Sequence, residues 1–138
     1  MKRIAVIDGQ GGGIGSLIIK SLRERFGETV EIIALGTNST ATTSMLKARA
    51  NKGATGENAI LWNAPKVDII AGTLSIVLGN GMLGELTPRM AEAVASSPAK
   101  KILLPFNQEH VAVVGVVREP LPHLIEMLVS SVKEDSDV

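Results

Sequence analysis

The stretch that decides the fold is Ile4-Ala5-Val6-Ile7-Asp8-Gly9-Gln10-Gly11-Gly12-Gly13-Ile14-Gly15. Its first four residues form a continuous apolar run, which is typical of a strand buried on both faces of a parallel sheet. Five glycines follow within seven positions. Apolar residues then recur every four positions and end before Gly27, the pattern of an amphipathic helix with a C-terminal glycine: Ile14, Ile18, Leu22 and Phe26. The stretch therefore predicts a strand, a glycine loop and a helix, in that order.

The rest of the chain continues this alternation of strands and helices. Apolar runs predict further strands at residues 30–35, 67–72, 101–106 and 111–117. No helix separates the last two, so the final strand is expected to be antiparallel to its neighbour. Helical spacing and end signals predict helices at residues 40–50, 59–64, 87–97 and 120–132, and the second of these could also be a strand. These elements predict an α/β fold, a Rossmann-like three-layer sandwich with a mostly parallel sheet of about five strands.

The length of 138 residues suits one domain, which we expect to span residues 1–132 as a nucleotide-binding-like unit. Residues 133–138 are acidic and lack apolar spacing, so we expect a disordered tail. The chain has no apolar run long enough to span a membrane and no signal-peptide pattern, which favours a cytoplasmic protein. A short chain with 45% hydrophobic residues has little interior in which to bury them, so a homo-oligomer, most simply a homodimer, is expected.

The composition also excludes several classes of chemistry. Fourteen basic side chains cancel fourteen acidic ones, so the whole molecule has no field that would attract nucleic acid. Only three aromatic residues are present, too few for base stacking: Phe26, Trp62 and Phe106. The absence of Cys and Tyr excludes thiolate and phenol mechanisms, and two histidines make a metal site unexpected. We expect no nucleic acid and no membrane partner, whereas the glycine cluster at residues 9–15 predicts a small phosphorylated ligand.

The glycine cluster has a spacing that discriminates between phosphate-binding loops. Glycines between a strand and a helix let the backbone approach a phosphate, which free N–H groups at the helix N-terminus can bind. The dinucleotide pattern Gly-x-Gly-x-x-Gly and the P-loop pattern both fail here. Gly9, Gly13 and Gly15 instead fit Gly-x-x-x-Gly-x-Gly. This resembles the cofactor loop of short-chain dehydrogenases, which implies NAD or NADP, although Asp8 replaces their Thr and their Tyr-x-x-x-Lys pair cannot exist here. The alternative is a glycine turn that serves only close packing.

Polar segments follow several of the predicted strands and should meet at one edge of the sheet, because parallel strands share a carboxyl edge. These segments are residues 8–15, 36–39, 72–73 and 107–110. Asp8 would orient the loop or bond a ribose, and Thr37 with Asn38 would contact the adenosine side. The candidate cofactor-binding residues are Asp8, Gly9, Gln10, Gly11, Gly12, Gly13, Ile14, Gly15, Thr37 and Asn38.

Four ordered motifs carry a resemblance over nearly the whole chain. They are Ile7-Asp8-Gly9-Gln10-Gly11-Gly12-Gly13-Ile14-Gly15, Ala34-Leu35-Gly36-Thr37-Asn38, Ala54-Thr55-Gly56-Glu57-Asn58-Ala59-Ile60 and Met82-Leu83-Gly84-Glu85-Leu86-Thr87-Pro88. Together they resemble a family of short bacterial single-domain proteins known as domain of unknown function 3842. The resemblance implies a protein of one domain and assigns no activity and no functional residue.

Three readings of the function remain open. The first is a nucleotide-binding protein, in which the loop binds the phosphates of a nucleotide or dinucleotide. The second is a small-molecule enzyme, a reductase or a sugar-phosphate isomerase, whose proton transfer would fall to Glu85, His110 or Glu57. Each of these has a simpler interpretation, as a surface, turn or helix-capping residue. The third is a ligand-responsive regulatory or interaction protein without catalysis. Trp62 is interpreted as a packing residue.

Overall fold

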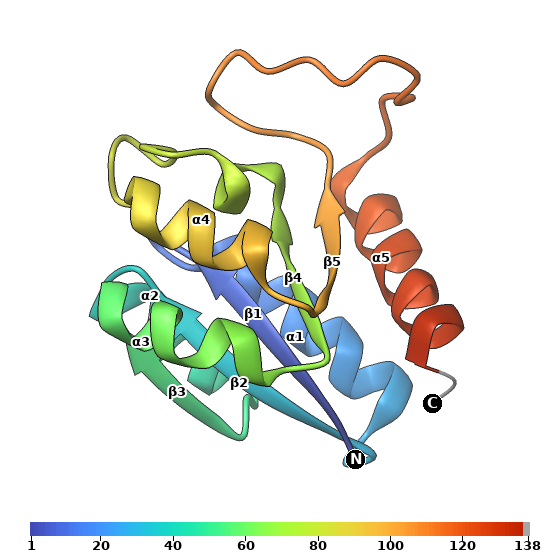
Figure 1. The fold of residues 1–138 in the computed structure, drawn as a ribbon. Coiled ribbons are helices and arrows are strands. Elements are labelled where there is room, and N and C mark those ends of the chain that lie inside the picture. Colours follow the sequence, from blue (N-terminus) through green and yellow to red (C-terminus); the bar gives the residue numbers. More distant parts are fainter. Residues whose placement is uncertain (137–138) are drawn as a thin grey trace.

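The computed structural model describes residues 1–136 and has a parallel five-stranded sheet with the strand order β3-β2-β1-β4-β5. All four pairings are parallel. The strands therefore point their carboxyl ends toward one edge, the upper edge in Figure 1. The strands are β1 (Lys2–Asp8), β2 (Val30–Gly36), β3 (Lys52–Thr55), β4 (Ile69–Thr73) and β5 (Lys100–Leu104). The predicted α/β class with a Rossmann-like sheet is confirmed.

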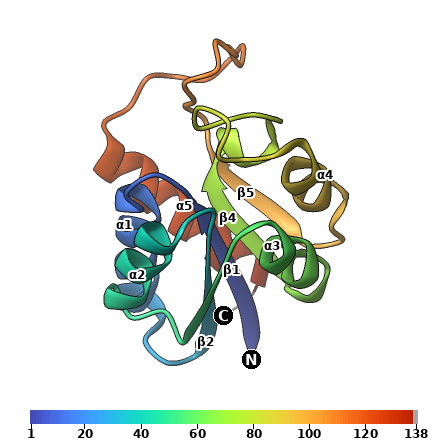
Figure 2. The ribbon, with the colours of Figure 1, turned by 90° about the vertical axis from the view of Figure 1, so that its left-hand side faces the viewer.

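Helices cover both faces of the sheet and give the three layers that the sequence predicts. Figure 2 shows α1, α2 and α5 on one side and α3 and α4 on the other. The helices are α1 (Gly13–Phe26), α2 (Ser39–Lys47), α3 (Glu57–Asn63), α4 (Pro88–Ser96) and α5 (Leu121–Ser136), with short 3-10 turns at Ala64–Lys66 and Leu74–Val77. The helical reading of residues 59–64 is thus confirmed over the strand alternative.

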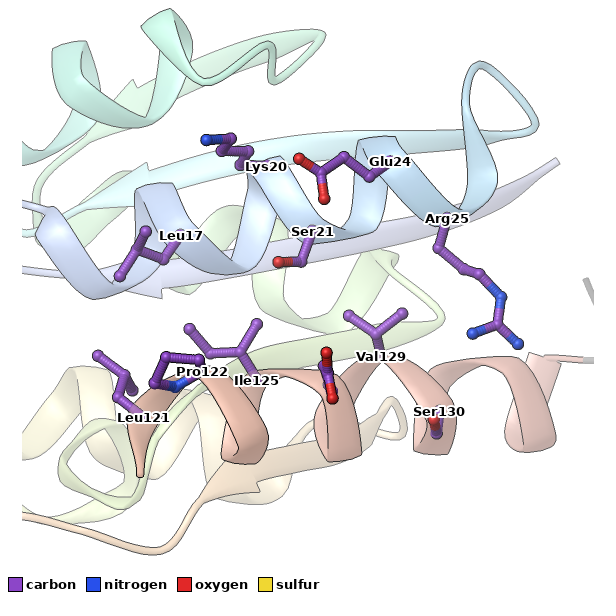
Figure 3. A pocket seen from close by; sticks show the side chains of 11 residues that line it. Leu17, Lys20, Ser21, Glu24, Arg25, Leu121, Pro122, Ile125, Val129 and Ser130 are labelled. Atoms are coloured by element: carbon purple, nitrogen blue, oxygen red, sulfur yellow. The ribbon is translucent and has the colours of Figure 1, made fainter. Parts of the chain in front are cut away.

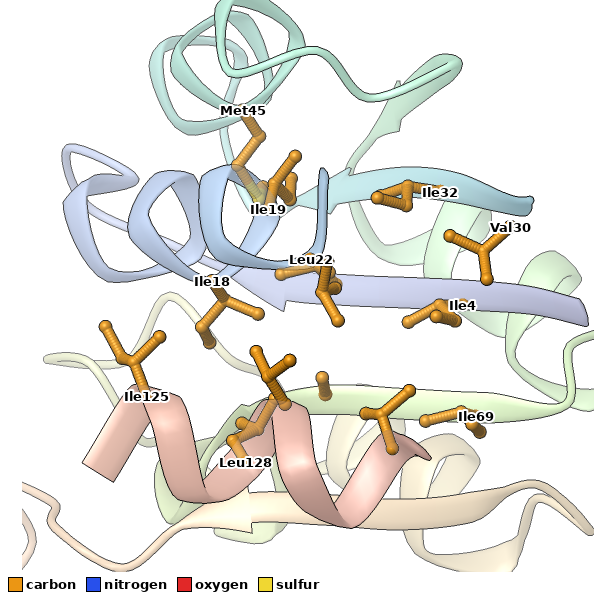
Figure 4. Packing of buried hydrophobic residues seen from close by; sticks show 14 of the residues in the cluster. Ile4, Ile18, Ile19, Leu22, Val30, Ile32, Met45, Ile69, Ile125 and Leu128 are labelled. Atoms are coloured by element: carbon orange, nitrogen blue, oxygen red, sulfur yellow. The ribbon is translucent and has the colours of Figure 1, made fainter. Parts of the chain in front are cut away.

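The apolar residues of β1 are buried on both faces of the sheet, as their continuous run in the sequence predicts. Ile4, Ala5, Val6 and Ile7 are at most 1% exposed. Ile4 and Val6 belong to the core under α1, α2 and α5, whereas Ala5 and Ile7 belong to the core under α3 and α4. Figure 4 shows the first of these cores, where side chains of α1 and α5 meet on the sheet. The central strand is therefore held from both sides, which fixes the loop that follows it.

The topology places a switch point at the carboxyl end of β1. The connection from β1 to β2 runs through α1 on one face, and the connection from β4 to β5 runs through α4 on the other face. The connections leaving the neighbouring strands β1 and β4 therefore diverge at this edge. In open α/β sheets a crevice forms at such a point and is the usual position of a ligand.

Three predictions about local structure are wrong, each for a physical reason. Residues 111–117 form no strand, because they lie in the long β5–α5 loop, which rises beyond the carboxyl edge, away from the sides of β5 (Figure 1). No strand is predicted at β3, which forms an edge strand of the sheet by pairing with the free edge of β2. Residues 133–136 are helical, because α5 continues one turn past its last buried residue, Val132. Asp137 and Val138 lie outside the described residues.

Trp62 is not a packing residue. Its side chain is 66% exposed, and the ammonium group of Lys66 lies 2.9 Å from the centre of its ring. The helix α3 is only seven residues long and is followed at once by a 3-10 turn that contains Pro65. Of its side chains only Ile60 is fully buried, so the indole is left on the outside.

Two leucines of α1 provide a test of this packing. Leu22 is fully buried in the core, whereas Leu17 is 43% exposed. Leu22→Ala is expected to lower the free energy of unfolding by about 3 kcal/mol, because it leaves a cavity in a close-packed interior. Leu17→Ala is expected to cost less than about 1 kcal/mol. Urea denaturation followed by circular dichroism measures both, and equal losses for the two variants would contradict the packing of α1.

Candidate functional site

The glycine loop, defined as Gly9–Gly15, is fastened from below by Asp8, the last residue of β1. The side chain of Asp8 is buried. Its Oδ1 accepts a hydrogen bond from the Gly9 N–H at 2.8 Å, and its Oδ2 accepts one from the Gly15 N–H at 2.7 Å. One carboxylate thus holds both ends of the loop and fixes the path of the backbone between them.

Three glycines of the loop are required by close contacts within the protein. A Cβ atom on Gly9 would lie 2.6 Å from both the Met82 sulfur and the Thr37 hydroxyl, and one on Gly15 would lie 2.7 Å from the Met45 sulfur. Gly12 has φ +71° and its Cβ would lie 2.8 Å from the backbone of Ala41. These positions fit the interpretation of the loop as a packing device.

Gly11 and Gly13 are different, because a Cβ atom on either would meet nothing within 4 Å. The N–H of Gly12 donates to the Gly9 carbonyl, which closes the turn. Within residues 1–136, the N–H groups of Gly11, Gly13 and Ile14 donate to no protein acceptor, and no side chain caps α1. Packing therefore explains Gly9, Gly12 and Gly15 but not Gly11 and Gly13. The three N–H groups without an acceptor lie at the start of α1, a helix of 14 residues.

The residues that follow β2 lie directly beside the glycine loop, as the sequence predicts. The Thr37 N–H donates to the Asp8 carbonyl at 3.0 Å. Asn38 caps α2 through its Oδ1, which accepts from the Ala41 N–H, and its Nδ2 donates to the Gln10 carbonyl at 3.0 Å. The two predicted parts of the site, residues 8–15 and Thr37 with Asn38, are thus brought together.

Glu85 joins these two parts, in a role that the sequence analysis did not predict. Its Oε1 accepts hydrogen bonds from the Gln10 N–H at 2.8 Å, the Thr37 hydroxyl at 2.7 Å and the Asn38 Nδ2 at 2.8 Å. Glu85 and Gln10 are 75 residues apart in the sequence, so no local spacing could show the contact. The sequence offered one signal, because Glu85 and Gln10 both lie in motifs that carry the family resemblance.

Glu85 is carried to this position by a strap, defined as residues 78–87, which connects the 3-10 turn after β4 to α4. Its backbone is unusual, with left-handed φ values at Asn80, Met82 and Leu83, each above +55°. Bulky residues rarely adopt this conformation. Met82 is buried against Gly9, whereas Leu83 is 91% exposed. The strap therefore crosses from the β4 side of the switch point to the glycine loop.

The two carboxylates of the site have opposite pKa shifts. Burial is the main cause that raises the pKa of Asp8 above its ordinary 3.8; hydrogen bonds from Gly15 and Gly9 oppose this rise, and the charge of Glu85 adds to it. The hydrogen bond from the Gln10 N–H, followed by that from Thr37, holds the pKa of Glu85 below its ordinary 4.5. Glu85 is therefore fully ionised at neutral pH.

The three proposed proton-transfer residues are not assembled into one group. Glu57 accepts from the Thr87 hydroxyl at 2.6 Å and lies 3.5 Å from the Arg89 guanidinium, so it links the start of α3 to α4. His110 lies exposed in the β5–α5 loop with φ +59°. No hydrogen bond within residues 1–136 joins any two of Glu57, Glu85 and His110. The neighbour of His110, Glu109, accepts from the Ser75 hydroxyl at 2.6 Å and ties that loop to the β4 side of the switch point.

A separate groove of about 610 Å³ lies between α1 and α5, on the flank of the molecule. Figure 3 shows its apolar side chains, among them Leu17, Ile125 and Val129, and the charged groups Lys20 and Glu24 along its upper side. It shares no residue with the glycine loop. In the described part of the chain, no three His, Asp or Glu side chains gather in an arrangement that could hold a metal ion. The helices of residues 1–136 include none with the length and apolar character needed to cross a membrane.

Comparison with known families gives one match over almost the whole chain. The family described as "Domain of unknown function (DUF3842)" matches residues 3–137. No curated protein has significant sequence similarity to the chain.

Two solved structures share the fold at low sequence identity. The first is a dodecameric FMN-dependent Ubix-like decarboxylase from Escherichia coli O157:H7, with a TM-score of 0.54, 15% identity, and coverage of 100% of this chain and 96% of that chain. The second is a "putative alcohol dehydrogenase" from Thermotoga maritima, with a TM-score of 0.51 and 12% identity. This second match covers 94% of the present chain but only 37% of the dehydrogenase. At these identities the similarity shows the fold alone, and the resemblance of the loop to short-chain dehydrogenases is not shown.

The Glu85 contacts predict a pH-dependent contribution to stability. Glu85→Gln keeps the shape and removes the charge, so it is expected to lower the free energy of unfolding by about 1 kcal/mol at pH 7. Because the folded-state pKa of Glu85 is lowered, its contribution is fully present above the ordinary 4.5 and is lost as the pH falls through the lower folded value. Asp8 is present in both proteins, so its own titration largely cancels in the difference.

Thermal unfolding of both proteins between pH 3 and pH 7 measures this difference, with Glu92→Gln as the control because Glu92 is exposed on α4. The difference in stability between wild type and Glu85→Gln should shrink toward low pH, and Glu92→Gln should be as stable as wild type throughout. A difference that stayed constant, or grew, as the pH fell would contradict the assigned contacts.

Proposed function

Because the chain belongs to the family described as a domain of unknown function, DUF3842, we propose a function from its geometry: it binds a nucleotide, specifically a dinucleotide such as NAD, with the phosphates on the glycine loop. The observation that carries the proposal is the set of free N–H groups at Gly11, Gly13 and Ile14. They stand at the positive end of the α1 dipole, and a Cβ atom on Gly11 or Gly13 would meet no neighbouring atom within 4 Å. Two glycines without a packing role are expected where a ligand must approach the backbone.

The charge around the loop favours a dinucleotide over a mononucleotide or a sugar phosphate. Within residues 1–136, no Lys or Arg side chain hydrogen bonds to residues 8–15, and the carboxylates of Asp8 and Glu85 lie close by. Each phosphate of a dinucleotide carries one negative charge, whereas a phosphate monoester carries nearly two at pH 7. Backbone donors without a cation suit the less charged group.

The arrangement of the neighbouring loops supports the same ligand. Thr37 and Asn38 follow β2 and lie beside the glycine loop, on the side where a parallel sheet with this strand order receives the adenosine. The two solved structures described above are named as an FMN-dependent decarboxylase and a putative alcohol dehydrogenase, both names that fit nucleotide-type cofactors. NAD and NADP are the cofactors to test first.

The contacts of Glu85 and Glu57 support a role in binding and not in proton transfer. Glu85 is held by three donors and its pKa is lowered, which suits an acceptor that stays ionised and not a general base. Glu57 is engaged by Thr87 and Arg89. The proposed function is therefore nucleotide binding, and Glu57 and Glu85 are given no part in a reaction.

Gly13→Val tests the proposed phosphate contact. A valine fits here without a clash, because the space is open, so the fold should remain intact. Its side chain would stand in the path of the phosphate, and we expect the affinity for NADH to fall at least about a hundredfold, from loss of charge-assisted contacts. Isothermal titration calorimetry measures the affinity. Ser130→Val, at an exposed position of α5, is the control, and unchanged affinity in a folded Gly13→Val protein would refute the proposal.

We also infer that the chain self-associates, because the β5–α5 loop exposes an apolar segment. Five valines there are between 42% and 98% exposed: Val111, Val113, Val114, Val116 and Val117. Contiguous apolar surface of this kind marks an interaction site in a folded protein. The decarboxylase that shares the fold is named as dodecameric, which fits association of such domains.

Sedimentation velocity tests the association. The double variant Val114→Lys and Val117→Lys places charge on the two most exposed of these valines and is expected to shift the population toward the monomer. Ser130→Lys serves as the matched control because it adds charge on α5, outside that loop. The inference fails if wild type is a monomer, or if the double variant keeps the wild-type size.

A further inference from the structure

We propose that Glu85 is the acceptor for a ribose hydroxyl of the bound nucleotide, so that the site takes nucleotides with a free 2′-hydroxyl and rejects those with a 2′-phosphate. This inference rests on the proposed function and names the class of nucleotide that the site selects. It makes Glu85 a specificity-determining residue, supplied by the strap that arrives from β4.

The carboxylate of Glu85 lies beside Thr37 and Asn38, the two residues that follow β2. Nucleotide-binding sheets with this strand order place an acidic residue there, and it hydrogen bonds the ribose hydroxyls. Here β2 is followed by Thr37 and Asn38, neither of which is acidic. Both donate instead to the Glu85 Oε1, which also accepts from Gln10 in the glycine loop. The strap thus brings a carboxylate to the place where the strand itself provides none.

The carboxylate of Glu85 is held by one of its two oxygens. Its Oε1 accepts three hydrogen bonds of 2.7–2.8 Å from two different connections, so the group is held firmly. Its Oε2 receives no protein donor within the described residues 1–136, and it is not among the buried atoms that lack a partner. One oxygen is anchored and the other is presented to a ligand. The low pKa of Glu85 keeps it ionised, which makes it a strong acceptor for a hydroxyl.

A 2′-phosphate at this position would meet negative charge from the protein. Enzymes that accept this group place an arginine beside it. No Lys or Arg in the described part of the chain hydrogen bonds to Thr37, Asn38 or Glu85, and Asp8 adds a second carboxylate nearby. A phosphate next to Glu85 would be repelled and would have no cation to compensate it.

The strained backbone of the strap fits this role. Met82 and Leu83 hold left-handed φ values of +58°, which cost energy for residues of their size. Such conformations persist where the surrounding structure requires them and occur most often at ligand sites. The strain lies two and three residues before Glu85, where the chain turns back toward the glycine loop.

The experiment compares NADH with NADPH, which differ only by the 2′-phosphate, on wild type, Glu85→Gln and the control Glu92→Gln. Isothermal titration calorimetry gives each dissociation constant, and circular dichroism checks that each variant is folded. Wild type and the control should bind NADH at least about tenfold more tightly than NADPH. Glu85→Gln should bind NADH about tenfold more weakly than wild type, and its preference should shrink to within about threefold.

A second series on wild type alone keeps the test independent of any variant. ADP should bind at least about fivefold more tightly than 2′-deoxy-ADP, because only ADP offers the hydroxyl. If wild type binds NADH and NADPH equally, or if folded Glu85→Gln keeps the full preference, the role of Glu85 is refuted while the nucleotide site stands. If wild type binds none of these compounds, the proposed function fails, and this inference fails with it.

Discussion

The site depends on the buried carboxylate of Asp8, which binds the N–H groups of Gly9 and Gly15 at the two ends of the glycine loop. Burial of this carboxylate costs free energy and raises the pKa of Asp8, and the hydrogen bonds from Gly15 and Gly9 offset part of that cost. The result is a loop fixed at both ends, in which the N–H groups of Gly11, Gly13 and Ile14 have no acceptor within residues 1–136. The turn closed by the Gly12 N–H on the Gly9 carbonyl and the bond from Gln10 to Glu85 hold the middle of the loop, and Asp8 holds its two ends.

The sheet determines what can reach this loop. Because β1 lies between β2 and β4, the connections after all three strands meet at its carboxyl end. Glu85 lies in the connection after β4. Its Oε1 accepts hydrogen bonds from Gln10, in the connection after β1, and from Thr37 and Asn38, in the connection after β2. The three connections are thereby held as one unit. A ligand on the loop would meet a preorganised surface and would lose little free energy in ordering it.

The sequence predicts what depends on local patterns. The apolar run of β1, the glycines and the four-residue spacing of α1 are contiguous, so this unit, its C-terminal glycine Gly27 and its neighbour β2 are predicted correctly. The strand β3 was missed because Lys52-Gly53-Ala54-Thr55 has almost no apolar signal and forms only by pairing with β2. Residues 111–117 have a strong strand pattern but lie beyond the carboxyl edge, where no strand is available to pair with them. The contact between Glu85 and Gln10 arises from topology, which single-sequence patterns do not encode.

The measurement that tests the central claim most directly is the identity of small molecules carried by the native protein. With one Trp and no Tyr, the protein absorbs weakly at 280 nm, so even partial occupancy by a nucleotide would dominate the spectrum near 260 nm. The purified protein would be denatured and the released molecules identified by mass spectrometry. The account predicts an adenine dinucleotide without a 2′-phosphate, in a fixed proportion to the protein. A phosphorylated ligand without a nucleoside, or a nucleotide that bears a 2′-phosphate, would contradict it.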